Sequence, residues 1–228
     1  MDGIHDLGGK PSFGPVDRSL TTHPFEHPWE GRVFAMINAA GRSGAYQNTD
    51  QFRHAIERIP PAYYFDHGYF GRWLAALELM LLESALVSEE ELKALPERPR
   101  NRAMSSGAHT QQATKADHDG QASSLKDLLA SDRRKPRLPH SGARFSENQK
   151  VRTISQSMPG HTRLPAFARG RDAVITDCHG LWPFPDARAH GLEPKEQQLY
   201  TVRLQRRSTL DEGVVHLDVF ELYLEDAS

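Results

Sequence analysis

Apolar residues recur at helical spacing in the first part of the chain. They predict a first helix that begins at Pro28, where the missing N–H of proline costs nothing, and ends near Gly41. Four residues would share one side of this helix and form its apolar face: Trp29, Val33, Met36 and Ile37. The pattern is typical of a helix with one buried stripe.

A second helix is predicted to begin at Asn48, which opens a capping-box-like sequence, and to end before Pro60-Pro61. Its apolar stripe consists of Phe52, Ala55, Ile56 and Ile59. Arg53 lies off this stripe. Its simplest interpretation is an exposed ion pair with Glu57, one helical turn further along.

A third helix is predicted from about His67 to Ser84, with Asp66 as its cap. Its apolar band is unusually broad and consists of Tyr69, Phe70, Trp73, Leu74, Leu77, Met80 and Leu81. A band of this width indicates either the core of a helix bundle or the aromatic wall of a pocket or subunit interface. A short helix is predicted to follow, from Ser88 to Leu95.

The second part of the chain has the pattern of a β structure. The strand candidates are the segments 151–154, 172–176, 199–204 and 213–220. About five short strands in roughly 80 residues favour a small barrel or sandwich. Residues 98–142 have almost no apolar period and predict a flexible linker. Residues 1–28 have no helical or strand period and are either disordered or, as we expect, an extended arm that docks on a partner. The predicted fold class is therefore α+β.

The composition excludes several functional classes. The chain has 228 residues and a formal net charge of −2, so it lacks the positive charge with which general nucleic-acid binders neutralise phosphates. No apolar run reaches the roughly 18 residues of a membrane span, and the first residues lack the features of a signal peptide. A cytoplasmic protein that binds neither nucleic acid nor membrane is expected.

The cysteine and histidine content constrains metal chemistry. Cys178 is the only cysteine, which excludes an internal disulfide and a thiolate cluster. The 12 histidines are scattered singly, without the paired spacing of a zinc site. No metal ligand is predicted in this chain, and the main ligands of any metal in a complex must come from elsewhere.

The segment from Met158 to Arg171 combines prolines, glycines and arginines between two strand candidates. Pro159 and Pro165 fix the backbone and remove N–H donors, so the segment is predicted to be a stiff loop. Arg163 lies near its middle. It is either a solvated arginine of a surface turn or a cation that the loop presents to a binding partner.

Several separated motifs occur in the chain in a fixed order. They are MDGIHDLGG at the start, FGPV at 13–16, DQFRHAIERI at 50–59, MPGHTRLPAFARG from 158, WPFPDARAHG at 182–191 and DVFELYLE at 218–225. Together they resemble the β subunit of nitrile hydratase over most of the chain. The resemblance implies an extended arm (1–28), a helical domain (29–97), a flexible linker (98–142) and a C-terminal SH3-like β-barrel domain (143–228).

The resemblance also implies a function. Enzymes of this family are lyases that hydrate nitriles to amides at a Co(III) or Fe(III) centre, which the α subunit holds with a Cys-x-x-Cys-Ser-Cys motif. That motif is absent here, so an obligate heterodimer with an α subunit, paired into an α2β2 heterotetramer, is expected. Arg53 and Arg163 would donate hydrogen bonds to oxidised cysteines of the α subunit. Part of the pocket for the small nitrile substrate would be formed by Tyr69, Trp73, Phe52, Ile37 and Thr49.

Three other interpretations are open. In thiocyanate hydrolase, small subunits resemble the two halves of this chain, although there the halves are separate polypeptides. Metal-insertion or assembly factors of the same family resemble the helical half alone. An unrelated SH3-like binding module with a helical arm is the third alternative. The presence of both halves in one chain favours the nitrile hydratase β subunit.

Overall fold

The computed structural model describes residues 3–10, 14–15, 24–94, 142–157, 160–192, 196–205 and 213–227. By its internal contacts the chain divides into two compact units. One comprises Met1–Ser88 together with Arg137–Ser228, and the other comprises Glu89–Pro136, where helix α5 (Glu89–Ala94) is described. The predicted linker lies outside the described residues except at its last position. No helix within the described ranges has the length and apolar character needed to cross a membrane.

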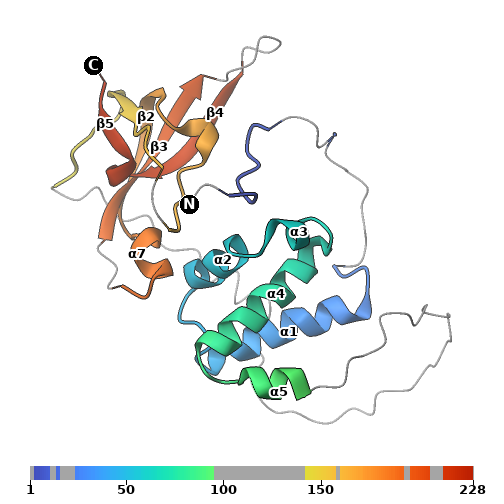
Figure 1. The fold of residues 1–228 in the computed structure, drawn as a ribbon. Helices are drawn as coiled ribbons and strands as arrows, with labels where there is room; N and C mark the ends of the chain where they lie inside the picture. The colour runs from blue at the N-terminus through green and yellow to red at the C-terminus, as the bar shows by residue number, and fades with distance from the viewer. Residues whose placement is uncertain are drawn as a thin grey trace. The chain divides into compact units, whose positions relative to one another are not determined.

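Four helices form the first part of the larger unit: α1 (Pro28–Arg42), α2 (Thr49–Glu57), α3 (Pro61–Tyr64) and α4 (Gly68–Glu83). Helix α4 packs against both α1 and α2 (Figure 1). The apolar core between them consists of Val33, Ile37, Ala40, Phe52, Ala55, Ala76, Leu77 and Met80. Six of these eight residues come from the predicted stripes, whereas Ala40 and Ala76 do not. Met36, predicted on the apolar face of the first helix, is instead 44% exposed.

The helix ends follow local capping chemistry. The side chain of Asn48 accepts hydrogen bonds from the backbone N–H groups of Asp50 and Gln51 at 3.0 and 3.1 Å, which confirms it as the cap of α2. Helix α4 is instead preceded by His67, not by the predicted cap Asp66. The sequence pattern missed α3, because Pro61 begins a new helical turn as well as ending the previous segment.

An antiparallel sheet of five strands forms the second part of the larger unit. Its strands are β1 (Lys150–Thr153), β2 (Asp172–Pro183), β3 (Glu196–Gln205), β4 (Val214–Phe220) and β5 (Leu224–Asp226), in the order β4-β3-β2-β1-β5. This arrangement confirms the α+β class. The edge strands β4 and β5 do not pair with each other in the described residues, so the sheet is not closed into a barrel.

Strand β2 is longer than its apolar segment predicts. It continues past Thr176 to Pro183, and its register against β3 shifts between Ile175 and Asp177 and again between Cys178 and Gly180. Such irregularities break the strict alternation of apolar and polar residues by which a strand is detected in a sequence. The core beneath the sheet includes the fully buried side chains of Val151, Ile175, Tyr200, Val202, Leu204 and Tyr223.

Helix α7 (Pro185–Ala189) follows β2 directly and packs against α2 (Figure 1). The sequence pattern predicted no helix in the second part of the chain, because five residues are too few to show a helical period. Through α7 the sheet segment contacts the helical segment.

Candidate functional site

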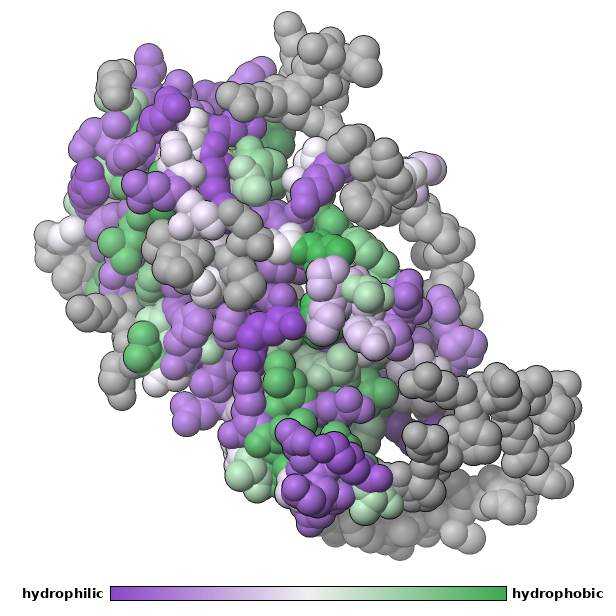
Figure 2. All heavy atoms as spheres, in the orientation of Figure 1, coloured by the Kyte–Doolittle hydropathy of each residue, from purple (hydrophilic) through white to green (hydrophobic). Residues whose placement is uncertain are grey.

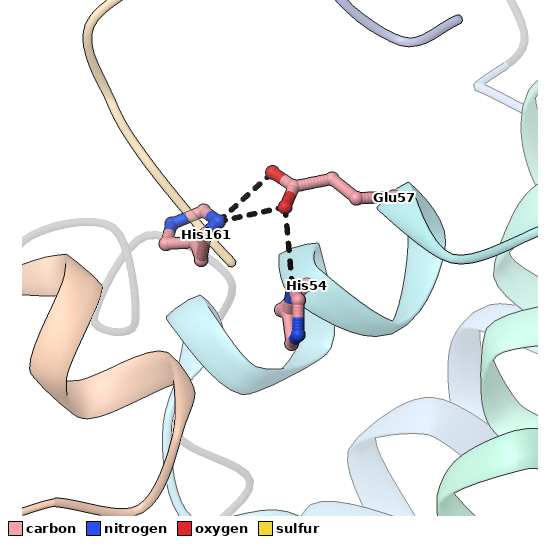
Figure 3. A group of neighbouring side chains, drawn as sticks. All are labelled: His54, Glu57 and His161. Atoms are coloured by element: carbon pink, nitrogen blue, oxygen red, sulfur yellow. Dashed lines mark hydrogen bonds and ion pairs between the residues drawn. The ribbon is translucent and has the colours of Figure 1, made fainter. Parts of the chain in front are cut away.

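Helix α2 and the loop before β2 bring three polar side chains together. His54 and Glu57 lie one turn apart on α2, so both project from the same face of the helix. His161 reaches Glu57 from the loop: its Nδ1 lies 2.9 Å from both carboxylate oxygens, and Nδ1 of His54 lies 3.3 Å from one of them (Figure 3). We refer to His54, Glu57 and His161 as the carboxylate cluster.

The carboxylate cluster is shielded from solvent. The side chain of His161 is fully buried, and that of Glu57 is 9% exposed. Burial alone would raise the pKa of Glu57, but the hydrogen bonds from His161 and His54 outweigh burial and bring this pKa down to about 2. Glu57 is therefore a charged carboxylate at neutral pH, held between two segments that are distant in the sequence.

Two further histidines border the carboxylate cluster. Nε2 of His5, in the N-terminal segment, lies 3.9 Å from a carboxylate oxygen of Glu57. His190 accepts a hydrogen bond of 3.3 Å from the backbone N–H of His161, and its ring centre lies 4.7 Å from that of His54. Burial lowers the pKa of both His5 and His190. A neutral imidazole is the form that can accept the His161 hydrogen bond.

The ligand-type atoms of the carboxylate cluster lie within 4.8 Å of one another, a spacing that a metal ion could bridge. Yet each imidazole already has a hydrogen-bonding contact with Glu57. These contacts satisfy the carboxylate without an ion. Within the described residues, Nε2 of His161 is buried and has no hydrogen-bond partner.

Arg53 lies on α2, directly before His54. Its guanidinium contacts Asp50 at 3.3 Å, and its side chain is 47% exposed. The ion pair with Glu57 that helical spacing suggested is not formed, because Glu57 is engaged by His54 and His161. Asp50 is itself buried and also lies 3.4 Å from the guanidinium of Arg188 on α7.

Arg163 lies on the loop that carries His161. Its side chain is exposed, and within the described residues it makes no hydrogen bond or ion pair. Its backbone N–H, in contrast, donates to the buried hydroxyl of Tyr223 at 3.1 Å, and that hydroxyl donates to Asp186 of α7. Burial and the nearby Asp186 raise the pKa of Tyr223, so the phenol stays protonated.

The five side chains predicted to contact substrate line one cavity of about 370 Å³ between α1, α2 and α4. They are Ile37, Thr49, Phe52, Tyr69 and Trp73. Arg53 also lines this cavity, together with Phe34, Asn38, Tyr46 and Ile56. Its inner wall is fixed by aromatic packing, since the rings of Phe52 and Trp73 meet edge to face at 4.9 Å. Arg163 is not among the lining residues.

Comparison with known proteins identifies the family. Residues 1–122 match the family model described as nitrile hydratase beta subunit, N-terminal, and residues 134–226 match its C-terminal counterpart. The chain belongs to the nitrile hydratase β-subunit family. This confirms the family resemblance seen in its motifs.

Relatives of known name cover the whole chain. The low-molecular weight cobalt-containing nitrile hydratase subunit beta of Rhodococcus rhodochrous is 34% identical over 98% of this chain and 99% of its own length. The cobalt-containing subunit of Pseudonocardia thermophila is 29% identical over 99% of this chain and 96% of its own length. A solved apo-enzyme structure of thiocyanate hydrolase from Thiobacillus thioparus is 20% identical, with a TM-score of 0.35, and covers 38% of this chain and 78% of that chain.

Within this nitrile hydratase β-subunit fold, the carboxylate cluster is the feature that the sequence pattern missed. The histidines looked scattered because they come from the N-terminal segment, α2, the loop and the end of α7. One local signal was present: His54 and Glu57 have the one-turn spacing that places two side chains on one helical face. The third member, His161, follows Glu57 by 104 residues and could be connected to it only by the fold.

Proposed function

We propose that this chain is the non-metal subunit of a nitrile hydratase, a lyase that adds water to a nitrile to form an amide. The observation that carries the proposal is the cavity between α1, α2 and α4. It gathers Arg53 and all five residues expected to contact substrate, in a chain of the nitrile hydratase β-subunit family. An apolar, aromatic cavity with one polar edge suits a small organic nitrile.

The metal would be held by the partner subunit. Family relatives are named as cobalt-containing, but the donor set of this chain does not fit a thiolate-bound metal. Cys178 is the single cysteine, and burial, together with Glu147 and Asp177 nearby, raises its pKa and disfavours the thiolate. A Co(III) or Fe(III) ion in an α subunit would supply Lewis-acid chemistry when bound.

The two arginines would act across the subunit interface. Both guanidinium groups are open to solvent in this chain, so a partner can reach them. Guanidinium stays charged and offers forked N–H donors, which suit the anionic oxygens of oxidised cysteines. Arg53 lies at the edge of the substrate cavity, so it would connect the bound nitrile with the partner's metal site.

The partner would also cover apolar surface. Large side chains stay exposed on the helical segment, among them Met36, Tyr63, Phe65 and Tyr69, which is 62% exposed. Figure 2 shows hydrophobic side chains open to solvent among hydrophilic ones on the helical segment. An α subunit seated there would close the cavity and bring the hydroxyl of Tyr69 against substrate. Pairing into an α2β2 heterotetramer completes the proposed assembly.

The domain organisation belongs to the same proposal. The arm (1–28) and helical domain (29–97) would be joined through the linker (98–142) to an SH3-like barrel (143–228). The support is the antiparallel order of the five strands. A closed barrel would also require the edge strands β4 and β5 to pair with each other.

A co-expression experiment tests the proposed function. We expect a tight complex that hydrates nitriles when this chain is produced with a partner that carries Cys-x-x-Cys-Ser-Cys. Arg163→Lys, which keeps the charge but loses the forked donors, should lower kcat about 100-fold. The complex itself should still form, as judged by size-exclusion chromatography.

Arg152→Lys is the matched control, because Arg152 forms an exposed ion pair with Asp172 on the sheet. That variant should keep full turnover. Undiminished turnover in Arg163→Lys would contradict the role given to Arg163. Nitrile hydration by the isolated chain would contradict the whole proposal.

A further inference from the structure

Helix α7 makes contact with the surroundings of both arginines. It has five residues, and two of its polar side chains, Asp186 and Arg188, point to different partners. Arg188 contacts Asp50 in the first turn of α2, and α2 is also the helix that carries Arg53. Asp186 contacts Tyr223, which holds the backbone of Arg163. The two arginines lie 110 positions apart, so the sequence alone does not reveal a connection between them.

The connection to Arg53 runs through Asp50. One carboxylate oxygen of Asp50 lies 3.4 Å from the guanidinium of Arg188, and the other accepts from the guanidinium of Arg53 at 3.3 Å. The side chain of Asp50 is only 8% exposed, so these two cations are its main electrostatic partners. The backbone carbonyl of Arg188 also accepts from the side chain of Asn48, the cap of α2, at 3.2 Å. Arg188 thus holds both the cap and the first turn of α2.

The connection to Arg163 runs through Tyr223. Its hydroxyl is fixed from both sides, because it accepts from the backbone N–H of Arg163 and donates to Asp186. Tyr223 is fully buried, so its ring cannot change position without disturbing the core. His161, two residues before Arg163 on the same loop, is held against α2 by its hydrogen bond with Glu57. The loop therefore has contacts with α2 and α7 on either side of Thr162.

We infer that Asp186 and Arg188 are positioning residues, which together set the placement of Arg163 relative to Arg53. The inference rests on the proposed function, in which both guanidinium groups must meet the same cluster of oxidised cysteines. Two donors can contact one small group only if their separation is fixed in advance. A short helix with a buried contact to each side provides that fixed separation, and neither Asp186 nor Arg188 needs to touch substrate or metal.

The test uses Arg188→Gln and Tyr223→Phe in the complex with the metal-carrying partner. Each variant removes one connection and leaves Arg53 and Arg163 in place. We expect kcat to fall about 10- to 100-fold, as is common when the group that orients a functional residue is removed. KM should change little, because the cavity residues are untouched. Arg188→Lys, which keeps the charge, should restore part of the loss.

The decisive measurement is whether the losses of turnover in the single variants add up in the double variants. If Arg188 acts through Arg53, then Arg188→Gln should cause little further loss in the background of Arg53→Lys. Tyr223→Phe should likewise cause little further loss in the background of Arg163→Lys. Losses that multiply independently in both double variants would overturn the inference.

Amide hydrogen exchange of the same complexes separates a failure of the positioning role from a failure of the proposed function. Arg188→Gln should speed exchange in the first turn of α2, and Tyr223→Phe should speed exchange at Arg163. The matched control Arg152→Gln should do neither. If exchange is unchanged in the first two variants, the inference is wrong whatever the activity. If exchange rises while Arg53→Lys and Arg163→Lys keep full turnover, the connections exist, but the role proposed for the two arginines and the positioning role both fail.

Discussion

At the scale of single residues, Glu57 is a buried carboxyl group whose lowered pKa has a clear structural cause. It lies between imidazoles from two segments, and their hydrogen bonds hold its pKa at about 2 despite burial. In the unfolded chain the same carboxyl would titrate near its ordinary value of about 4.3. The charged form is therefore preferred by the folded state, which gains stability at any pH where the unfolded carboxyl is ionised.

This difference predicts a pH-dependent contribution to stability. Glu57→Gln should lower the free energy of unfolding at pH 7 by on the order of 2 kcal/mol. Because the folded-state pKa is depressed, the contribution is fully present above about pH 4.5 and is lost as the pH falls towards 2. Urea unfolding of both proteins across this range should show their stabilities converging.

Glu78→Gln is the control for that experiment, since Glu78 is exposed on α4. It should shift stability little and without this pH profile. A deficit in Glu57→Gln that stays constant from pH 7 to pH 2.5 would show that the charge of Glu57 is not what stabilises the fold.

At the scale of elements, the start of α2 combines a cap with a docking contact. Asn48 accepts from two backbone N–H groups of its own helix and donates to the carbonyl of Arg188 on α7. One side chain therefore satisfies two of the unpaired N–H groups at the start of α2 and also connects α2 to α7.

Two substitutions separate these roles. Asn48→Ala removes both and should destabilise the protein by about 1 to 2 kcal/mol. Asn48→Asp keeps the acceptors for the cap and loses only the donor to Arg188, so it should cost distinctly less. Thermal unfolding of the two variants measures the difference. Equal destabilisation would mean that the contact with Arg188, rather than the cap, dominates.

The elements differ in how far the sequence could predict them. Helices α1, α2 and α4 were predictable because each has a regular apolar stripe, and these stripes supply most of the core. The five-residue helix α7 was not, since it is shorter than two turns and begins at a proline that also suits a turn. The register shifts in β2 hid its second half for a similar reason.

The site shows the same limit. The cavity residues and the two arginines were accessible through family motifs, and the structure brings the cavity residues and Arg53 together. The contact between Glu57 and His161 and the contacts between α7 and α2 were not accessible, because they join residues more than 100 positions apart. No local pattern encodes such a pair, and only the fold brings its members together.

At the scale of the whole molecule, the helices of residues 24–88 and the sheet of residues 142–227 belong to one compact unit. Their contacts include the hydrogen bonds between Glu57 and His161 and the ion pair between Asp50 and Arg188. Each of these contacts includes at least one buried side chain, so the helices and the sheet should stay associated without a covalent connection.

Cleavage within the predicted linker tests this cohesion. A protease site inserted after Lys115 should give, on digestion, two fragments that elute together from a size-exclusion column. The same nicked chain with Glu57→Gln and Arg188→Gln should separate into two species, because both buried connections are weakened. A nicked chain carrying Arg152→Gln is the control and should stay together. Separation of the unsubstituted nicked chain would show that the linker itself is required.

The long sequence separation of these contacts has a consequence for synthesis. Glu57 meets a partner 104 residues later, and Asn48 meets one 140 residues later. At roughly 5 to 20 residues per second, a ribosome needs about 5 to 30 seconds to make those stretches. During that interval α2 has no α7 to pack against, Asp50 lacks Arg188 and Glu57 lacks His161. The surface that carries Arg53 therefore matures only when most of the chain has been made, so joining a partner subunit follows synthesis of this chain rather than accompanying it.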